Sequence, residues 1–441
     1  MLKQSLVNGS FAKKALAAIV LTLGLSAFAF ACLGCTSTQQ ASSSSADSSS
    51  SQQEAADDSA TDADFELLTD GEAMTVFAAN SSAFELTGEE NACYSPASYY
   101  IALAMVAAGA DGEAQDQLFT ALGASSTEEL DEYCQTQLMG LASSDEYSTI
   151  DISNSLWSNV GYMFQAEYQE AVEKFFDAGA FDVEFGTQQT NDMIKEWISD
   201  ETRGLLEPDI KTDEAMVAML INTIYFNDTW QEAFVEGATD SEIFHAPSGD
   251  VEAEFMHNTT DFGTYIEGEG YTAAQMPFSN GSTCTFFLPD PESSVSEMLS
   301  SPQKISDMLL AEPNSTAQIS WSVPKFETSS KFEDLIKCAN KLGVTEIFNP
   351  SSGYMFRNMI VAETSADIEF YISDALQETT IKLDEYGVEA AAYTSFSIRA
   401  TSLLPEMEEI VDFVLDRPFA YAITAPNGVP LFMGVVVNPA A

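Results

Sequence analysis

Two histidines, His245 and His257, are the only imidazole side chains in the 441-residue chain, and they limit the chemistry that it can perform. Neither lies beside an evident nucleophile, so a Ser-His-Asp triad has no support in the sequence. The motifs G-x-S-x-G and H-E-x-x-H are absent, and so is a glycine-rich loop that would bind phosphate. The sequence therefore argues against a hydrolase, and we expect no cofactor.

The cysteines give no sign of a metal site. Four of the six lie beyond residue 35, namely Cys93, Cys134, Cys284 and Cys338. No C-x-x-C pair occurs among these four, so no zinc site is predicted. Cys93 and Cys284 lie inside apolar stretches, which favours buried thiols. An exported chain could still pair its cysteines, and the pairing stays open.

Acidic residues dominate the charge of the chain. It has 69 aspartates and glutamates against 16 lysines and arginines, a formal net charge of -53. Such a surface repels nucleic acid and anionic membranes, because both need clustered basic residues. We interpret the charge as a solubilising surface in preference to a dedicated cation-binding role.

Residues 1–35 carry the features of an export signal. Three lysines precede an uncharged run, 15–31, which is short for a membrane-spanning helix of about 20 residues. The sequence that follows, "ACLGC", resembles the signal of a bacterial lipoprotein, in which a cysteine receives lipid. Cys35 fits that position better than Cys32, and an ordinary secretory signal is the alternative. We expect an exported protein, either lipid-anchored at the outer face of a bacterial membrane or extracellular.

Composition divides the rest of the chain into two parts. Residues 36–63 are mostly Ser, Ala, Gln and Asp, which predicts a disordered tether. Residues 64–441 show no second break and predict one large domain. Its pattern is mainly helical up to about Lys211, and apolar strand-like runs dominate from Met216 onward. This order indicates an α+β fold with large antiparallel sheets.

The stretch from Glu385 to Pro405, "EYGVEAAAYTSFSIRATSLLP", has the alternation of a half-buried strand. One set of alternate residues is small or mostly apolar: Val388, Ala390, Ala392, Thr394, Phe396 and Ile398. Yet the stretch opens with a glycine and an alanine-rich patch, which suit a strand poorly. The segment is therefore patterned for a sheet without being committed to one.

Several motifs in order and at the right spacing resemble the serpin family of serine protease inhibitors. "FVLDRPFAYAITAPNGVPLFMGVVVNP", 413–439, is similar to the family's C-terminal signature. "NACYSPASYYIALAMVAAGADGEAQDQL", 91–118, resembles an early helix, and "LINTIYFNDTWQEAF", 220–234, a strand that leads to a buried tryptophan. "VPKF" and "KLGVTEIF" also match, so the resemblance covers nearly all of residues 64–441.

The resemblance implies a serpin fold, with a large, mainly antiparallel central sheet, further sheets, helices mostly in the N-terminal half and an exposed reactive-centre loop. "DEYGVEAAAYT", 384–394, resembles the hinge of that loop. In inhibitory serpins the loop is protease bait, and after cleavage its first half inserts into the large sheet as a strand. The hinge residues by this match are Glu385, Gly387, Val388, Glu389, Ala390, Ala391, Ala392 and Thr394.

The resemblance also implies a reactive bond, less closely defined. Family spacing from Glu385 places it at Thr401–Ser402. Counting back from "RPF" places it several residues later. The alternatives are Arg399 for a trypsin-like protease, Ala400 for an elastase-like one, and Leu403 or Leu404 for a chymotrypsin-like one.

Further residues match the family's support regions. The shutter, a hydrogen-bonded region beneath the opening sheet, is matched by Ser95, Pro96, Ser98 and Asn222. The breach, where insertion begins, is matched by Trp230, Lys325 and Glu385. Two positions depart from the pattern. Gln377 stands where many serpins have a shutter histidine, which puts that network in doubt, and Val388 replaces the usual Thr or Ser at the first inserted position.

The function that follows is inhibition of serine proteases by a suicide substrate. The inserting loop would trap the protease as an acyl-enzyme. The alternative is a non-inhibitory serpin that acts as a binding or carrier protein at the cell surface. The alanine run favours inhibition, because non-inserting hinges tend to carry bulky or charged residues. We expect a monomer whose partners are trypsin-, elastase- or chymotrypsin-like serine proteases, with no nucleic acid and no membrane contact except through the lipid anchor.

Overall fold

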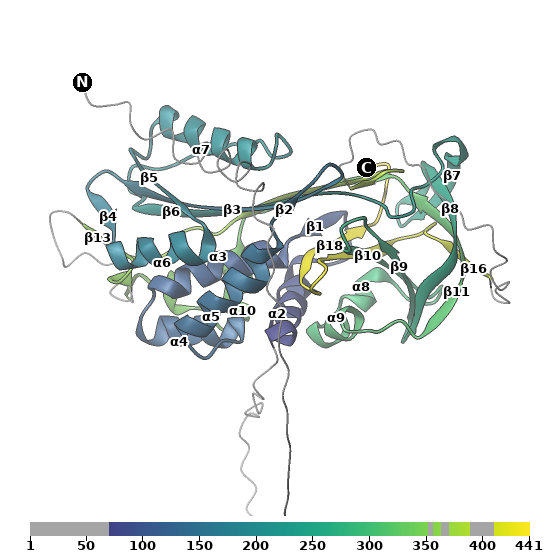
Figure 1. Ribbon diagram of the computed structural model, residues 1–441, viewed down its shortest axis with the longest axis horizontal. Coiled ribbons are helices and arrows are strands. Elements are labelled where there is room, and N and C mark those ends of the chain that lie inside the picture. Colours follow the sequence, from purple (N-terminus) through teal and green to yellow (C-terminus); the bar gives the residue numbers. More distant parts are fainter. Residues whose placement is uncertain (1–69, 352–355, 363–369, 389–409) are drawn as a thin grey trace, which may run out of the picture. The chain divides into compact units, whose positions relative to one another are not determined.

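The computed structural model describes residues 70–351, 356–362, 370–388 and 410–441 (Figure 1). Residues Asp64–Ala441 form one compact unit. Its helices are concentrated in the first part of the chain. They are α2 (Asp70–Glu85), α3 (Pro96–Gly109), α4 (Gly112–Leu122), α5 (Thr127–Tyr133), α6 (Ala166–Phe176), α7 (Gln188–Glu201), α8 (Val295–Met298), α9 (Pro302–Leu309) and α10 (Leu335–Lys341), with the short turns η1 (Cys134–Leu138), η2 (Met139–Leu141), η3 (Glu236–Ala238) and η4 (Glu346–Phe348).

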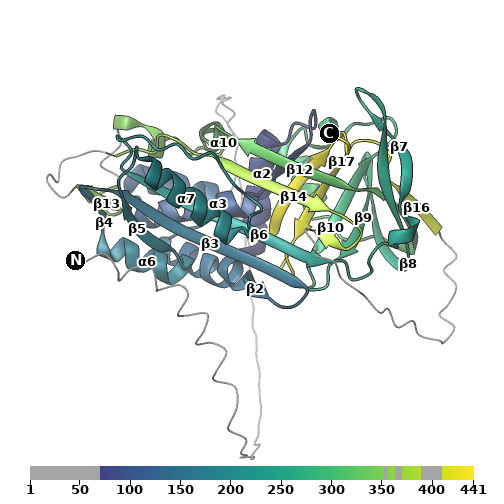
Figure 2. The same ribbon diagram turned by 90° about the horizontal axis from the view of Figure 1, so that it is seen from above.

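A seven-stranded sheet runs through the unit (Figure 2). Its strands lie in the order β12-β14-β15-β6-β3-β2, and β5 also pairs with β3. All of its ladders are antiparallel except the parallel pair β3–β5. The strands are β2 (Ser143–Ser144), β3 (Ser148–Asn159), β5 (Gly179–Val183), β6 (Ala218–Thr229), β12 (Phe326–Phe332), β14 (Gln377–Leu383) and β15 (Gly387–Val388).

A nine-stranded sheet and a small two-stranded sheet complete the β structure. The larger one has the order β1-β18-β17-β10-β9-β8-β11-β16, with β7 paired to β8, and β11–β16 is its one parallel ladder among the described strands. Its strands are β1 (Ala92–Tyr94), β7 (Asp240–Ala246), β8 (Gly249–Gly268), β9 (Tyr271–Pro277), β10 (Thr283–Pro289), β11 (Ser315–Pro324), β16 (Ile410–Val414), β17 (Phe419–Thr424) and β18 (Pro430–Val436). The two-stranded sheet pairs β4 (Tyr162–Phe164) with β13 (Ile360–Ala362).

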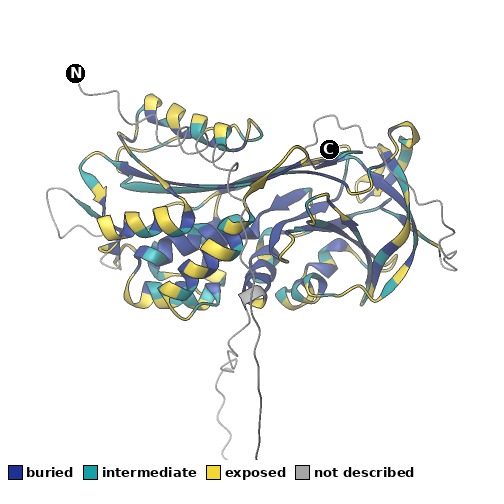
Figure 3. Ribbon diagram, in the orientation of Figure 1, coloured by how far each residue is buried: buried dark blue, intermediate teal, exposed yellow. Residues whose placement is uncertain are grey.

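Helices cover both faces of the seven-stranded sheet. In Figure 1, α3 and α6 lie below it and α7 lies above it. Successive residues of β3 face opposite sides: Leu156 belongs to the main core, and Trp157 packs with Ile194 and Ile198 of α7 in a second cluster. Burial colouring shows the strands of the sheet mostly as buried or intermediate and α7 mostly as exposed or intermediate (Figure 3). The sheet is therefore enclosed on both faces along β3.

The helix boundaries follow local sequence signals. Ser95 caps α3, its side chain accepting from the Ser98 amide, and Pro96 occupies the first helical position. Helix α4 ends at Gly123, which adopts φ 69°. None of the helices in the described ranges combines the length and hydropathy that crossing a membrane requires.

The predicted α+β fold is confirmed, with helices mostly in the N-terminal half and large, mainly antiparallel sheets. The apolar run 218–226 lies in β6, which has a paired strand on each side. The region up to Lys211 is mainly helical, as predicted, although the twelve-residue β3 also lies there. Cys93, Cys134, Cys284 and Cys338 are all buried free thiols, and no disulfide joins them among the described residues.

Candidate functional site

The hinge predicted at Gly387 and Val388 already occupies a place in the seven-stranded sheet. After β14 the chain reverses through a tight turn, in which the Asp384 amide donates to the Gly387 carbonyl at 3.0 Å. The returning residues form β15, with Val388 opposite both Leu383 of β14 and Asp228 of β6. Val388 is 1% exposed. The position predicted to insert first thus holds a buried apolar side chain, which shows how valine is accommodated there.

Gly387 fits its position because β6 approaches it closely. A Cβ atom at residue 387 would lie 1.9 Å from the carbonyl oxygen of Asp228. No side chain can occupy that space unless the strands separate. The absence of a side chain at residue 387 therefore permits the hinge to pair with β6.

Trp230 closes one side of the hinge turn. Its backbone amide donates to the Tyr386 carbonyl at 2.8 Å, and its indole Nε1 donates to the Asp384 carbonyl at 3.0 Å. The ring is 2% exposed and stacks on Phe278, with 4.4 Å between centroids and planes 10° apart. This anchored, rigid aromatic surface fixes the backbone of the turn at two points.

Glu385 is the buried charged residue of the turn. Its Oε1 lies 2.7 Å from Lys325 Nζ and accepts a hydrogen bond from the Thr239 hydroxyl, also at 2.7 Å. Its carbonyl accepts from the Phe234 amide at 3.0 Å. Burial by itself would raise the pKa of Glu385, but the hydrogen bonds from Lys325 and Thr239 outweigh it and hold the pKa below its usual value. The carboxylate is therefore kept ionised beneath the hinge.

The predicted breach residues lie together. Trp230, Lys325 and Glu385 meet around the turn from three different segments, so the structure brings together residues that are up to 155 positions apart in the chain. Lys325 also reaches Glu254 of β8 at 3.8 Å. Burial lowers the pKa of Lys325, but the hydrogen bond and charge of Glu385 raise it by more. The pKa of Lys325 therefore lies above its ordinary value. The functional role of this cluster stays a prediction.

The predicted shutter residues divide into two separate networks. Ser95 donates from its hydroxyl to the Leu431 carbonyl of β18 at 2.8 Å and caps α3 at the Ser98 amide. Gln377, at the start of β14, donates to the Ser95 carbonyl and accepts from the Ser95 amide, both at 2.9 Å. The doubt that the sequence raised about Gln377 is thus answered for the hydrogen bonds, since the glutamine links β14 to α3.

Asn222 lies in the second network, on β6. Its Nδ2 donates to Asn154 Oδ1 of β3 at 2.9 Å, and Asn154 Nδ2 donates to the Phe176 carbonyl at 2.8 Å. The Oδ1 atom of Asn222 is buried without a hydrogen-bond partner. Within the described residues no side-chain hydrogen bond joins Asn222 to Ser95, so these two shutter candidates belong to separate networks in this conformation.

Sequence reasoning missed several residues of the site. Thr239 and Phe234 hold Glu385, and Phe278 supports Trp230, but none of them belongs to a motif that marks this role. Nothing in the local sequence indicates which threonine will face a distant carboxylate. Other predicted residues lie outside the described part of the chain: Glu389, Ala390, Ala391, Ala392, Thr394, Arg399, Ala400, Thr401, Ser402, Leu403, Cys32 and Cys35.

Comparison with known proteins agrees with this architecture. The family described as "Serpin (serine protease inhibitor)" matches residues 73–439. Putative serpin-Z12 of Oryza sativa subsp. japonica is 32% identical over 382 residues, which cover 80% of this chain and 86% of that protein. Serpin-ZX of Arabidopsis thaliana is 28% identical over 370 residues, covering 79% and 92%.

Solved structures show the same fold. The thermophilic serpin tengpin in its native state superposes with a TM-score of 0.73 and 28% sequence identity. The match covers 83% of this chain and 94% of tengpin. Serpins are generally protease inhibitors and not enzymes. The family match over most of the chain, the relatives and the shared fold together establish that this chain belongs to the serpin family.

Proposed function

We propose that the protein inhibits serine proteases as a suicide substrate. A protease attacks a bond in the segment that follows Val388 and forms an acyl-enzyme ester. The cleaved segment then inserts between β14 and β6 before water hydrolyses the ester. The attached protease is carried along, and small displacements within its catalytic groups lower the rate of hydrolysis by a large factor.

The observation that carries this proposal is the position of β15. It lies between β14 and β6 and pairs with both in antiparallel fashion. In the residues that the structure describes, β14 and β6 do not pair directly with each other. The chain is next described at β16, in the other sheet, where it pairs with β11. The segment after Val388 therefore starts from the short strand β15, between β14 and β6. Insertion would continue β15 in the same direction between these two strands.

The register of β15 supports insertion of the alanine run. Val388 lies opposite Leu383 and Asp228, so an extension by two residues places Ala390 between Ile381 and Phe226. Both of these neighbours belong to the main core. A small side chain fits there without displacing them, and the small or apolar residues of the alternation face the same way.

The same register gives the unpaired oxygen of Asn222 a partner. Six residues beyond Val388, Thr394 falls opposite Gln377 of β14 and Asn222 of β6. The Thr394 hydroxyl would then be close to the buried Asn222 Oδ1, which has no hydrogen-bond partner in this conformation. Insertion would thereby satisfy a buried acceptor, which contributes to the stability of the inserted state. In this way the two shutter networks would meet only after insertion.

Incubation with trypsin, an elastase, chymotrypsin and subtilisin tests the proposal. We expect one of these proteases to form a complex with the purified protein that survives a denaturing gel. The mass of the released C-terminal peptide would identify the cleaved bond. We expect Thr401–Ser402, and the same mass would reveal cleavage after Arg399, Ala400, Ser402, Leu403 or Leu404 instead.

Heat stability separates inhibition from the binding or carrier role. Insertion extends the two-residue β15 into a long strand between β14 and β6, so the cleaved protein should unfold at a much higher temperature than the intact one. If cleavage raises the unfolding temperature but gives no stable complex, the loop inserts, and it is only a substrate for the four proteases tested. Cleavage with neither a complex nor the gain would overturn the proposal in favour of a non-inserting binding protein.

We further propose export and anchoring through lipid on Cys35. The basis is the sequence of residues 1–35, which resembles a lipoprotein signal. Fractionation of a bacterial host that expresses the full chain provides the test. The protein should be found with the membrane, and Cys35→Ala should release it, while Cys32→Ala should not. Recovery of the wild-type protein in the cytoplasm would contradict the proposal.

A further inference from the structure

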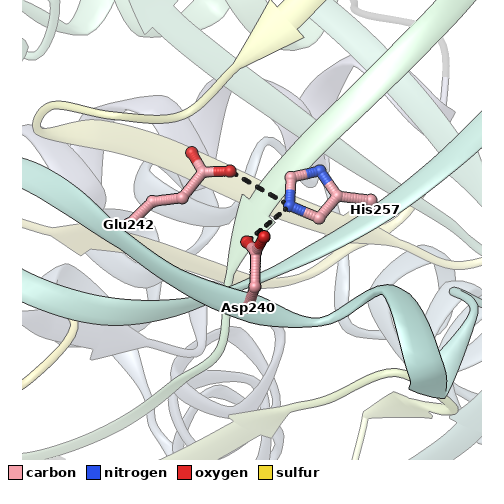
Figure 4. A group of neighbouring side chains, drawn as sticks. All are labelled: Asp240, Glu242 and His257. Carbon is pink, nitrogen blue, oxygen red and sulfur yellow. Dashed lines mark hydrogen bonds and ion pairs between the residues drawn. The ribbon is translucent and has the colours of Figure 1, made fainter.

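Three side chains with metal-binding atoms converge beside the hinge. Asp240 and Glu242 lie two residues apart on β7, and His257 lies on the neighbouring strand β8. Asp240 is paired with Phe255, two residues from His257, so all three side chains emerge on the same side of the strand pair. Figure 4 shows the two carboxylates directed at one imidazole nitrogen. The three ligand atoms lie within 4.8 Å of one another.

The distances within this cluster suit a tetrahedral ion. His257 Nε2 is 3.3 Å from Asp240 Oδ1 and 3.1 Å from Glu242 Oε1. Zinc bonds of about 2.0–2.1 Å give a tetrahedron whose edges are about 3.3–3.4 Å, close to both distances. The Asp240 side chain is 70% exposed, so it can rotate to complete the third edge. The protein atoms thus approximate three corners of a zinc site.

A single hydrogen on His257 Nε2 would satisfy the two carboxylates less well than a divalent metal ion. His257 Nε2 carries at most one hydrogen, which two carboxylates would have to share. In the described part of the chain, neither Asp240 nor Glu242 forms an ion pair with a lysine or arginine. A divalent cation bonded to all three atoms would offset both negative charges at once. The acidic surface, with a net charge of -53, would also raise the local concentration of cations.

We propose that Asp240, Glu242 and His257 bind one divalent ion of the zinc class, with a fourth position open to water. An imidazole with two carboxylates is a ligand set that zinc accepts. Calcium takes six to eight oxygen ligands, and magnesium prefers an octahedron of oxygens, so both should bind more weakly. The sequence did not predict this site, because its ligands, on the consecutive strands β7 and β8, match no metal-binding motif.

An ion bound at this site would affect the structure beside the hinge turn. Thr239, the residue before Asp240, donates the hydrogen bond to Glu385 of the hinge turn. The carbonyl of His257 accepts from the Val235 amide, in the same connecting segment, at 3.3 Å. A bound ion would therefore tie β7 to β8 immediately beside the contact that holds the hinge. Binding to this conformation would raise the unfolding temperature.

Zinc titration of the purified, chelator-treated protein tests the site. Calorimetry with zinc chloride should show one saturable site per chain, and zinc should raise the unfolding temperature. His257→Gln should weaken zinc binding by at least about tenfold. Asp240→Asn and Glu242→Gln should each weaken it in the same direction. Magnesium and calcium chloride should give smaller effects at equal concentration.

Two matched controls lie on the same strand pair. His245 contacts a single carboxylate, Asp250 at 2.8 Å, so His245→Gln should bind zinc as the wild type does. Glu252 is exposed on β8, and Glu252→Gln should also leave binding unchanged. Unfolding temperatures without zinc will show whether each variant is folded.

Two results would overturn the proposal. One is the absence of a saturable site, or equal zinc binding by His257→Gln and the wild type. The other is the binding of many zinc ions that no variant changes, because such binding would reflect only the general acidity of the surface.

Discussion

The side-chain amide of Gln377 joins the backbone of Ser95 twice, donating from Nε2 to the Ser95 carbonyl and accepting at Oε1 from the Ser95 amide, at 2.9 Å in each case. Both residues are buried, so these bonds replace water for two backbone groups. They attach the first residue of β14 to the cap of α3. An imidazole has nitrogens that point away from each other, so a histidine at residue 377 cannot form the same pair of bonds.

Gln377→Ala should therefore lower stability through two unpaired backbone groups. We expect a loss of about 2–4 kcal/mol in the free energy of unfolding. Gln377→His should lose less, because one of the two bonds can be kept. Urea unfolding followed by circular dichroism measures both. Gln303→Ala is the control, since Gln303 contacts only Asp307 on the exposed surface of α9, and its change should stay within about 0.5 kcal/mol. Equal effects of Gln377→Ala and Gln303→Ala would contradict this account.

The sequence carried most information where apolar residues are continuous. The apolar runs after Met216 predicted a strand-rich region, and β6 and β17 are formed by two of these runs, 218–226 and 419–424. Strand β8 was missed, because its twenty residues include many charged and polar side chains on a partly exposed surface. Strand β3 was missed for a different reason: both of its faces are packed, so it lacks a simple alternation of apolar and polar residues.

The site could be predicted only where the residues belong to a motif. Family resemblance located Trp230, Lys325 and Glu385, and the structure places them in contact around one turn. Thr239 lies 146 residues before Glu385, and its contribution depends on how β7 begins beside the hinge. The packing of separate segments determines such contacts, and a single sequence does not encode them as a local pattern.

Glu385 should make stability depend on pH in the acidic range. Its pKa in the folded protein is lowered, so its ionised form contributes stability above the ordinary glutamate pKa of about 4.3. This contribution is lost as the pH falls through the lower, folded-state value. Unfolding temperatures of wild type and Glu385→Gln should differ most near pH 7 and converge at the acidic end. We expect a difference of about 1–2 kcal/mol at neutral pH, moderated because Lys325 is one-third exposed.

The exposed pair of Lys195 and Glu207 supplies the comparison for that pH series. Its two side chains are 44% and 64% exposed at a separation of 3.2 Å. Solvent screens such a pair, so Glu207→Gln should change stability little at any pH. If the Glu385→Gln difference stayed constant down to the lowest pH, the ionised form of Glu385 would not be the source of the stabilisation.

Gly387→Ala should remove β15 from the sheet. The added Cβ would meet the Asp228 carbonyl oxygen at 1.9 Å, a distance that no rotation of a side chain relieves. We expect a loss of about 1–3 kcal/mol and faster hydrogen exchange of the backbone amides at 387–388. Gly237→Ala is the matched control, because no atom lies within 4 Å of its Cβ position. Unchanged exchange in Gly387→Ala would show that the hinge is not held by pairing with β6.

The proposed insertion predicts opposite outcomes for arginine at two adjacent alanines. In the extended register of β15, residue 390 lies between the core residues Ile381 and Phe226. In the same register, residue 391 would lie between Thr380, which is half-buried, and Tyr225, on the opposite face of the sheet. On that face the Arg203 guanidinium lies over the Tyr225 ring, 4.9 Å from its centroid. Ala390→Arg would thus place an unpaired charge in the core on insertion, a cost of several kcal/mol. Ala391→Arg would direct the same charge to a face that already accommodates an arginine.

Both variants should be cleaved by a protease that recognises the wild type, since residues 390 and 391 lie well before the expected bond. Ala390→Arg should then yield cleaved protein without a denaturant-stable complex and without a gain in unfolding temperature. Ala391→Arg should retain both properties, because its side chain does not enter the core. Denaturing gels and thermal unfolding before and after cleavage measure the two outcomes. If both variants trapped the protease equally well, the cleaved segment would not follow the register set by Val388, and the alternation of small residues would need a different explanation.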